Sequence, residues 1–184
     1  GNTKAMTETI LKDYARAYCV ESICFRYFNA AGAEPTNFDL GQEPGATHII
    51  ARVLEASLAN RAFTINGEDY RTPDGTCIRD YVHVWDIALA HILGVAYTER
   101  DAKTDGVAEV FNLGTNTGIS NKEIVDYVEK NYGLPFVNFG PNRAGDPDAL
   151  IADDHKASFM LGWTPQHSTL KQIVESAYKW YTRK

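Results

Sequence analysis

The sequence predicts an α/β fold, because predicted strands and predicted helices alternate along the chain. The strand segments are rich in apolar, β-branched and aromatic residues, and the helix segments repeat apolar residues every three to four positions. Clusters of Gly, Pro, Asn and Asp separate these segments. The 184 residues are 44% hydrophobic and 11% aromatic, which is enough apolar material for one core. The sequence shows no internal repeat, low-complexity tract or obvious linker, and we therefore expect one structural unit.

The first half of the chain begins with a helix and a strand. Residues 3–18 repeat apolar side chains at helical steps, and "SICFRYF" (22–28) is rich in aromatic and β-branched residues, as strands are. The loop over 29–45 is long enough to suggest a functional role. The next predicted elements are a helix over 47–60 with Thr47 as N-cap, strands over 62–66 and 81–84, and a helix from Ile87 to about Tyr97 that Asp86 caps.

The second half repeats the alternation. A strand over 108–114 precedes a helix in which Ser120 and Glu123 form a capping box and Gly133 marks the end. The remaining predicted elements are short strands over 135–140 and 149–153, a short helix over 155–163 ending at Gly162, and a last helix from about Thr169.

Charge and composition argue against several function classes. The net charge is −6 without a basic run, so we expect no nucleic acid partner. No apolar run is long enough to span a bilayer, and no signal-peptide pattern opens the chain. Cys19, Cys24 and Cys77 lack CxxC spacing and the five histidines lack metal-ligand spacing, so we expect reduced thiols, a cytoplasmic protein and no metal site. The motifs GxGxxG, GxxxxGK[ST] and GxSxG are absent.

Arg79 and Asp80 form a charged pair directly before the apolar segment "YVHV". A guanidinium flanked by residues that should be buried needs a partner. One interpretation is a structural ion pair of Arg79 with Asp80 or with a helix. The other is a bidentate grip on a phosphate or carboxylate ligand, for which a planar guanidinium is suited.

The segment "NRAGDPDAL" (142–150) sets a second arginine, Arg143, three residues before Asp146. One interpretation is a surface turn with a local ion pair of little energetic value. The other is a loop that holds a diphosphate with the arginine and sugar hydroxyls with the aspartate. Together with Arg79, and with Asn29 at the end of the first strand, this loop favours a nucleotide or nucleotide-sugar pocket.

The histidines and tryptophans give weaker signals. His83 alternates with valines and is expected in the core. His48 opens a helix, where capping and ligand contact are both plausible. Trp163, Trp180 and Tyr181 lie on helix-packing stripes and are expected to be buried.

Four segments carry a resemblance to a known family: "FRYFNAAGAEP", "GEDYRTPDGTCIRDYVHVWDIALAH", "FNLGTNTGIS" and "NRAGDPDAL". They resemble, in order and over essentially all residues, the carboxyl-terminal half of the UDP-glucose 4-epimerases, which are extended short-chain dehydrogenases/reductases. The resemblance implies an extended Rossmann-type fold with a small mixed α/β substrate-binding subdomain. Residues 1–30 would end the NAD-binding fold, 108–132 would be its returning strand and helix, and 31–107 with 133–184 would form mostly the substrate-binding subdomain.

The resemblance also implies roles for individual residues. The family's Tyr-x-x-x-Lys pair would end at Lys4, a catalytic and cofactor-binding residue, and the tyrosine would precede Gly1. Tyr27 and Phe28 align with residues lining the nicotinamide of NAD. Leu150 aligns with the residue that gates the sugar pocket. The substrate-binding residues implied for the UDP-sugar are Asn29, His48, Ile49, Thr64, Ile65, Asn66, Arg79, Arg143, Asp146 and Leu150.

The resemblance therefore implies an isomerase activity of galactose metabolism, in which UDP-glucose and UDP-galactose interconvert through transient oxidation at C4 with NAD. We expect this chain to be the substrate-binding half, inactive alone, of an enzyme that is a homodimer at full length. The alternatives are an enzyme for another nucleotide sugar (UDP-N-acetylhexosamine, UDP-arabinose or UDP-glucuronate) or a non-catalytic UDP-binding module.

Overall fold

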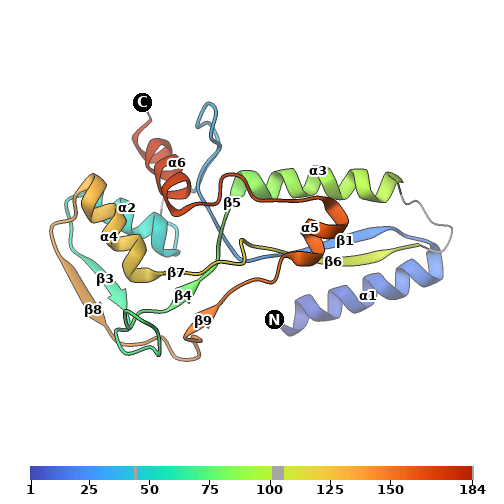
Figure 1. The fold of residues 1–184 in the computed structure, drawn as a ribbon, viewed down its shortest axis with the longest axis horizontal. Coiled ribbons are helices and arrows are strands. Elements are labelled where there is room, and N and C mark those ends of the chain that lie inside the picture. The colour runs from blue at the N-terminus through green and yellow to red at the C-terminus, as the bar shows by residue number, and fades with distance from the viewer. Residues whose placement is uncertain (44, 101–105, 184) are drawn as a thin grey trace.

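The computed structural model describes residues 1–43, 45–100 and 106–183, and it confirms the predicted α/β class. Its elements gather at two ends (Figure 1). At one end, strand β1 (Ser22–Tyr27) pairs in parallel with β6 (Ala108–Leu113). Helix α1 (Asn2–Tyr18) lies on one face of this pair and α3 (Val84–Arg100) on the other.

The β1–β6 end has its own core. Phe111, Leu113 and Trp163 are buried there, beside the short helix α5 (His155–Leu161). On the α1 side, the Arg26 guanidinium donates two hydrogen bonds of 2.7 and 2.6 Å to the carboxylate of Glu8 and so ties β1 to α1. This end therefore has the helix–strand–helix layering of an α/β fold.

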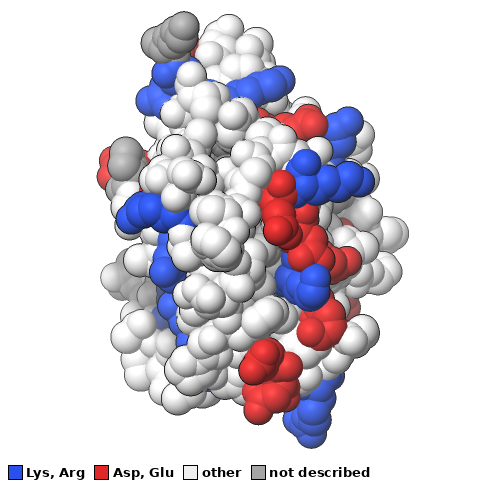
Figure 2. All heavy atoms as spheres, turned by 90° about the vertical axis from the view of Figure 1, so that its left-hand side faces the viewer, with Lys and Arg blue, Asp and Glu red and all other residues white. Residues whose placement is uncertain are grey.

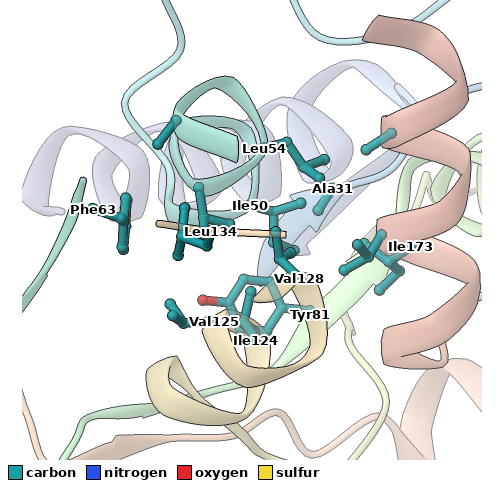
Figure 3. Close-up of a cluster of buried hydrophobic side chains, with 14 of the residues drawn as sticks. Ala31, Ile50, Leu54, Phe63, Tyr81, Ile124, Val125, Val128, Leu134 and Ile173 are labelled. Carbon is teal, nitrogen blue, oxygen red and sulfur yellow. The ribbon is translucent and has the colours of Figure 1, made fainter. Parts of the chain in front are cut away.

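The other end contains a larger core, which Figure 3 shows in close-up. Strand β3 (Phe63–Asn66) pairs in parallel with β8 (Val137–Gly140). Helices α2 (Ile49–Leu58), α4 (Asn121–Tyr132) and α6 (Leu170–Thr182) pack against one another beside these strands. Side chains one helical turn apart, such as Ile50 and Leu54, face this core and are fully buried.

Short strands connect the two ends. Strand β2 (Asn29–Ala31) pairs in parallel with β5 (Tyr81–His83). Strand β4 (Ile78–Arg79) lies between β7 (Ile119–Ser120), to which it is antiparallel, and β9 (Ala149–Leu150), to which it is parallel. These pairings bring four distant parts of the chain to one region between the two ends, since β4 and β5 follow each other directly.

Several predicted helix ends are confirmed. The capping box of Ser120 and Glu123 is present, and α4 has Gly133 as C-cap. Gly162 ends α5 in the left-handed conformation, with φ of 65°. Thr169 caps α6 in a second capping box.

Two predicted N-caps are wrong. The N-cap of α2 is His48 rather than Thr47. Helix α3 starts at Val84, directly after β5, so Asp86 lies within its first turn. His83 Nδ1 accepts the first free N–H instead, from Trp85 at 3.0 Å. Asp86 turns inward and accepts hydrogen bonds from the 166–168 segment.

The structure distributes the 108–132 segment between the two ends, because β6 pairs with β1 whereas α4 packs with α2 and α6. The division into NAD-binding and substrate-binding parts stays a prediction. Figure 2 shows the α2–α4 end, where Lys and Arg side chains are scattered among acidic and uncharged ones. Over residues 1–43, 45–100 and 106–183, no helix is both long and apolar enough to cross a membrane.

Candidate functional site

A cavity of about 290 Å³ opens between α2, β3, the β4–β5 segment and the 142–150 loop. Residues from these separate parts of the chain line it, and most of the residues that the sequence singled out are among them. The predicted residues that line the cavity are Asn29, His48, Ile49, Thr64, Ile65, Asn66, Arg143 and Asp146.

Arg79 does not line this cavity, but it contacts Asp146, which does. Its side chain is only 11% exposed. Nη1 donates to the backbone oxygens of Ile78, at 2.7 Å, and Pro147, at 2.9 Å. Nη2 lies 3.5 Å from Asp146 Oδ2, but it is buried and has no hydrogen-bond partner in the described chain. The Nη1 donors of Arg79 are thus satisfied by the protein, whereas the Nη2 donors remain without an acceptor in the described chain.

Asp80 does not pair with Arg79, so that interpretation of the charged pair is wrong. The Asp80 carboxylate is almost fully buried and accepts from the backbone N–H groups of Thr115, at 2.9 Å, and Ala152, at 3.1 Å. It also accepts from Asn116 N–H and from the Thr115 hydroxyl. Successive residues of an extended chain point to opposite sides, so Asp80 fastens the segment from behind while Arg79 faces the 142–150 loop.

The 142–150 loop presents Arg143 and Asp146 from a tight turn. The Asp146 N–H donates to the Arg143 carbonyl at 3.2 Å, and Gly145 adopts a φ of 81°, which favours glycine. The Asp148 carboxylate accepts from Arg71 Nε at 2.9 Å and anchors the end of the loop. Arg143 is exposed and has no ion-pair partner among the described residues. The surroundings of Asp146 therefore carry two cations for one carboxylate.

Three lining residues that sequence reasoning missed lie at the β4–β5 side of the cavity. Cys77 is buried, and its Sγ lies 3.1 Å from Asn121 Nδ2, which donates to it. Burial raises the pKa of the Cys77 thiol and that of the Tyr81 hydroxyl. Tyr81 alternates with Arg79 along the strand segment, a spacing that could have placed both on the cavity side.

Three more lining residues that were not predicted as site residues are Thr47, Arg52 and Phe63. Arg52 lines the cavity one helical turn after His48, and its guanidinium carbon lies 5.9 Å from the centre of the Phe63 ring. Arg52 could have been found from its i+4 spacing to His48. The pKa of His48 is lowered by burial, which favours the neutral imidazole.

The residues implied to contact the nicotinamide lie elsewhere. Tyr27 is half-exposed at the end of β1, and its hydroxyl lies 2.8 Å from His91 Nε2 on α3. Phe28 follows it, and Lys4 is exposed on α1. Leu150, on β9, is half-exposed and pairs with Arg79 in the parallel ladder. None of these four lines the cavity.

Metal and disulfide chemistry find no support within residues 1–43, 45–100 and 106–183. No group of three or more His, Cys, Asp or Glu side chains there could hold a metal ion. The cysteines are free, with Cys19 exposed and Cys77 buried.

Comparison with known proteins places this chain in a family. The GDP-mannose 4,6 dehydratase family model matches residues 1–177. A UDP-glucose 4-epimerase of Rhizobium meliloti (strain 1021) is 42% identical over all of this chain and 55% of its own length. The UDP-glucose 4-epimerase of Brucella ovis, solved in complex with NAD, is 39% identical with a TM-score of 0.86 over 96% of this chain and 54% of that protein.

A UDP-glucose 4-epimerase of Bifidobacterium longum, solved in complex with NAD⁺ and UDP, is 32% identical with a TM-score of 0.84 over all of this chain and 54% of that protein. The chain thus spans about half the length of the relatives it matches, and it matches their carboxyl-terminal half. The chain belongs to the GDP-mannose 4,6 dehydratase family of extended short-chain dehydrogenases/reductases and is similar, within it, to the UDP-glucose 4-epimerases.

Proposed function

We propose that this chain is the substrate-binding half of an NAD-dependent UDP-sugar 4-epimerase that interconverts UDP-glucose and UDP-galactose. The single observation that carries the proposal is Arg79, whose buried Nη2 has no hydrogen-bond partner in the described chain and lies 3.5 Å from Asp146, a residue that lines the cavity together with Arg143. A buried guanidinium donor without a partner is costly unless a ligand supplies the acceptor.

A diphosphate fits this arrangement. Guanidinium groups bind phosphate oxygens through paired N–H donors, and each charge-assisted bond contributes about 1.5–3 kcal/mol. With the diphosphate on Arg79 and Arg143, the Asp146 carboxylate is placed to accept from ribose hydroxyls. The base then lies along β3, beside Thr64 and Asn66.

Firm anchoring of the UDP end suits an epimerase. In the proposed reaction the sugar is oxidised at C4, turns, and is reduced from its other face, so it has to rotate without leaving the enzyme. The arginines of this chain hold the part of the substrate that stays fixed while the sugar moves. Leu150, which is half-exposed on β9, would border the sugar.

Residues of this chain also fit the nicotinamide end of NAD. Tyr27 and Phe28 stand at the carboxyl end of β1, which is where open parallel sheets bind nucleotides. Lys4 lies on α1, which packs on the same pair of strands. When bound, NAD supplies the hydride acceptor for C4. No GxGxxG phosphate cradle is present in this sequence, and we therefore propose that residues 1–184 alone do not catalyse the reaction.

Calorimetric titration with UDP tests the substrate site. We expect residues 1–184 to bind UDP, and Arg143→Gln to weaken this binding by about 10- to 100-fold, the loss of one charge-assisted bond. Arg61→Gln is the matched control, because Arg61 is exposed and lies off the cavity. If UDP does not bind, or if both variants lose the same affinity, the proposed site is wrong.

Two further assays separate the alternatives. Conversion of UDP-galactose by residues 1–184 with added NAD would contradict the inactive half-enzyme. A panel of UDP-glucose, UDP-N-acetylglucosamine, UDP-arabinose and UDP-glucuronate, each compared with UDP in calorimetry, would show which sugar adds affinity. Equal affinity for UDP and for every UDP-sugar would favour a UDP-binding module instead.

A further inference from the structure

Strand β3 ends in an Asn–Gly pair, Asn66–Gly67, and no other asparagine in the sequence is followed by glycine. Gly67 adopts a φ of 85°, and a Cβ at this position would clash with Asn142 Oδ1 and Tyr70 Cε2. The turn after β3 therefore requires glycine, both for its backbone conformation and for space.

The two residues of this pair are held differently. Asn66 lines the cavity, and its carboxamide makes no hydrogen bond to another residue of the described chain. The Gly67 N–H donates to the Gly140 carbonyl at 2.9 Å, directly after the final pair of the β3–β8 ladder, in which Asn66 and Gly140 are partners. The side-chain carbonyl of Asn66 is thus free, whereas the backbone nitrogen that follows it is engaged.

We propose that Asn66 is a site of spontaneous deamidation and that opening of the final pair of the β3–β8 ladder controls its rate. In this reaction the Gly67 N–H loses its proton to solvent base, the nitrogen attacks Cγ of Asn66, and ammonia leaves as a five-membered succinimide forms. Water then opens the ring at either carbonyl and gives aspartate or isoaspartate. The net change is the gain of one water and the loss of one ammonia. Glycine favours the attack because it places no side chain beside the nitrogen.

Two features of the folded chain oppose ring formation. The Gly67 nitrogen has to give up its hydrogen bond to Gly140 before it can lose its proton and attack. Asn66 belongs to β3, whose extended backbone turns the following nitrogen away from the side chain, so the chain has to rotate before the ring can close. Because both obstacles lie at the last pair of a short ladder, we expect this pair to open without unfolding of the larger core.

The product would change the wall of the cavity. Aspartate and isoaspartate both carry a carboxylate where the chain has a neutral carboxamide, on the same lining as Asp146. Isoaspartate also lengthens the backbone by one carbon directly before Gly67, where the turn packs against Asn142 and Tyr70. The ladder therefore delays a reaction that alters the cavity.

The test is peptide mapping by mass spectrometry after incubation of residues 1–184 at mildly alkaline pH, in buffer and in denaturing urea. We expect Asn66 to convert in urea and to convert at least about tenfold more slowly in buffer. Asn60 is the internal control, because it is exposed but followed by Arg61, and it should stay intact over the same time. An Asn66 that stays intact in urea, or that converts equally fast in both solutions, would overturn the inference.

Two valine variants separate opening of the final ladder pair from unfolding of the whole chain. Val137→Ala removes both γ-methyl groups from β8, where Val137 packs against the larger core, and Val110→Ala makes the same change on β6. In buffer, Val137→Ala should speed the conversion of Asn66 by about threefold or more, and Val110→Ala should leave the rate within about twofold of the wild type. Equal rates in the two variants, whether faster than the wild type or unchanged, would show that this ladder does not control the reaction.

Discussion

Replacement of Asp80 tests whether its buried carboxylate stabilises the fold around Arg79 by accepting hydrogen bonds from three backbone N–H groups. In Asp80→Ala, the backbone N–H groups of Thr115, Asn116 and Ala152 lose their acceptor. Each buried group left without a partner costs about 1–3 kcal/mol, so we expect these three groups to cost at least about 3 kcal/mol in the free energy of unfolding. That is a large share of the roughly 5–15 kcal/mol typical of a folded domain.

Asp80→Asn should cost less, about 2 kcal/mol, for a geometric reason. The amide nitrogen can replace Oδ1, where the Thr115 hydroxyl can turn to accept. The remaining oxygen keeps the N–H groups of Thr115, Asn116 and Ala152, all of which bond Oδ2. The loss is then the charge assistance of bonds that are otherwise retained.

Urea unfolding followed by tryptophan fluorescence measures these differences, with the m-value checked for each variant. Asp69→Ala is the control, because Asp69 is exposed and should change the free energy of unfolding by less than about 0.5 kcal/mol. An Asp80→Ala variant within 1 kcal/mol of the wild type, or one no less stable than Asp80→Asn, would refute the reasoning.

Three other predictions concern packing, pH and thiol chemistry. Gly32→Ala should lower the melting temperature more than Gly45→Ala. Both glycines have positive φ, but only the new Cβ at Gly32 would clash with a neighbour, His83 Nε2, at 2.6 Å. Equal losses of melting temperature would contradict this. Burial lowers the pKa of His83 to about 4. As the pH falls from 6.5 to 4, the imidazole of residue 83 therefore takes up a proton only in the unfolded chain. The free energy of unfolding should fall by up to about 3 kcal/mol across that window. His83→Gln, compared by urea unfolding at pH 7 and 4.5, should show a smaller fall than the wild type. Iodoacetamide should alkylate exposed Cys19 well before Cys77, whose thiol is buried with a raised pKa, and mass spectrometry that finds Cys77 modified first would disprove this.

The longer elements could be predicted from the sequence because their signals are local. The apolar repeat of residues 3–18 and the capping box of Ser120 and Glu123 lie within the helices that they specify. The two-residue strands β4 and β7 were not predicted, since they exist only through pairing with distant segments. Asp86 shows the same limit, because its partners come from the 166–168 segment.

The candidate site was predicted unevenly for a related reason. Residues in recognisable motifs, such as Arg79 and Arg143, were singled out before the cavity was known. Arg52, Phe63 and Asn121 belong to ordinary helix and strand patterns, and only the packing of α2, β3 and α4 brings them to the cavity. The orientation of Arg79 away from Asp80 also needed the structure, because either partner was chemically reasonable.

The pairing of β3 with β8 has a consequence for synthesis of the protein. Thr64 and Asn138 are partners in this ladder, so the β3 wall of the cavity is complete only when the second strand has emerged from the ribosome. Asn29 and Arg143 are likewise separated by most of the chain. A nascent chain that stops short of residue 137 lacks the strand partner of β3 and two lining residues, Arg143 and Asp146, so the cavity is completed late in synthesis.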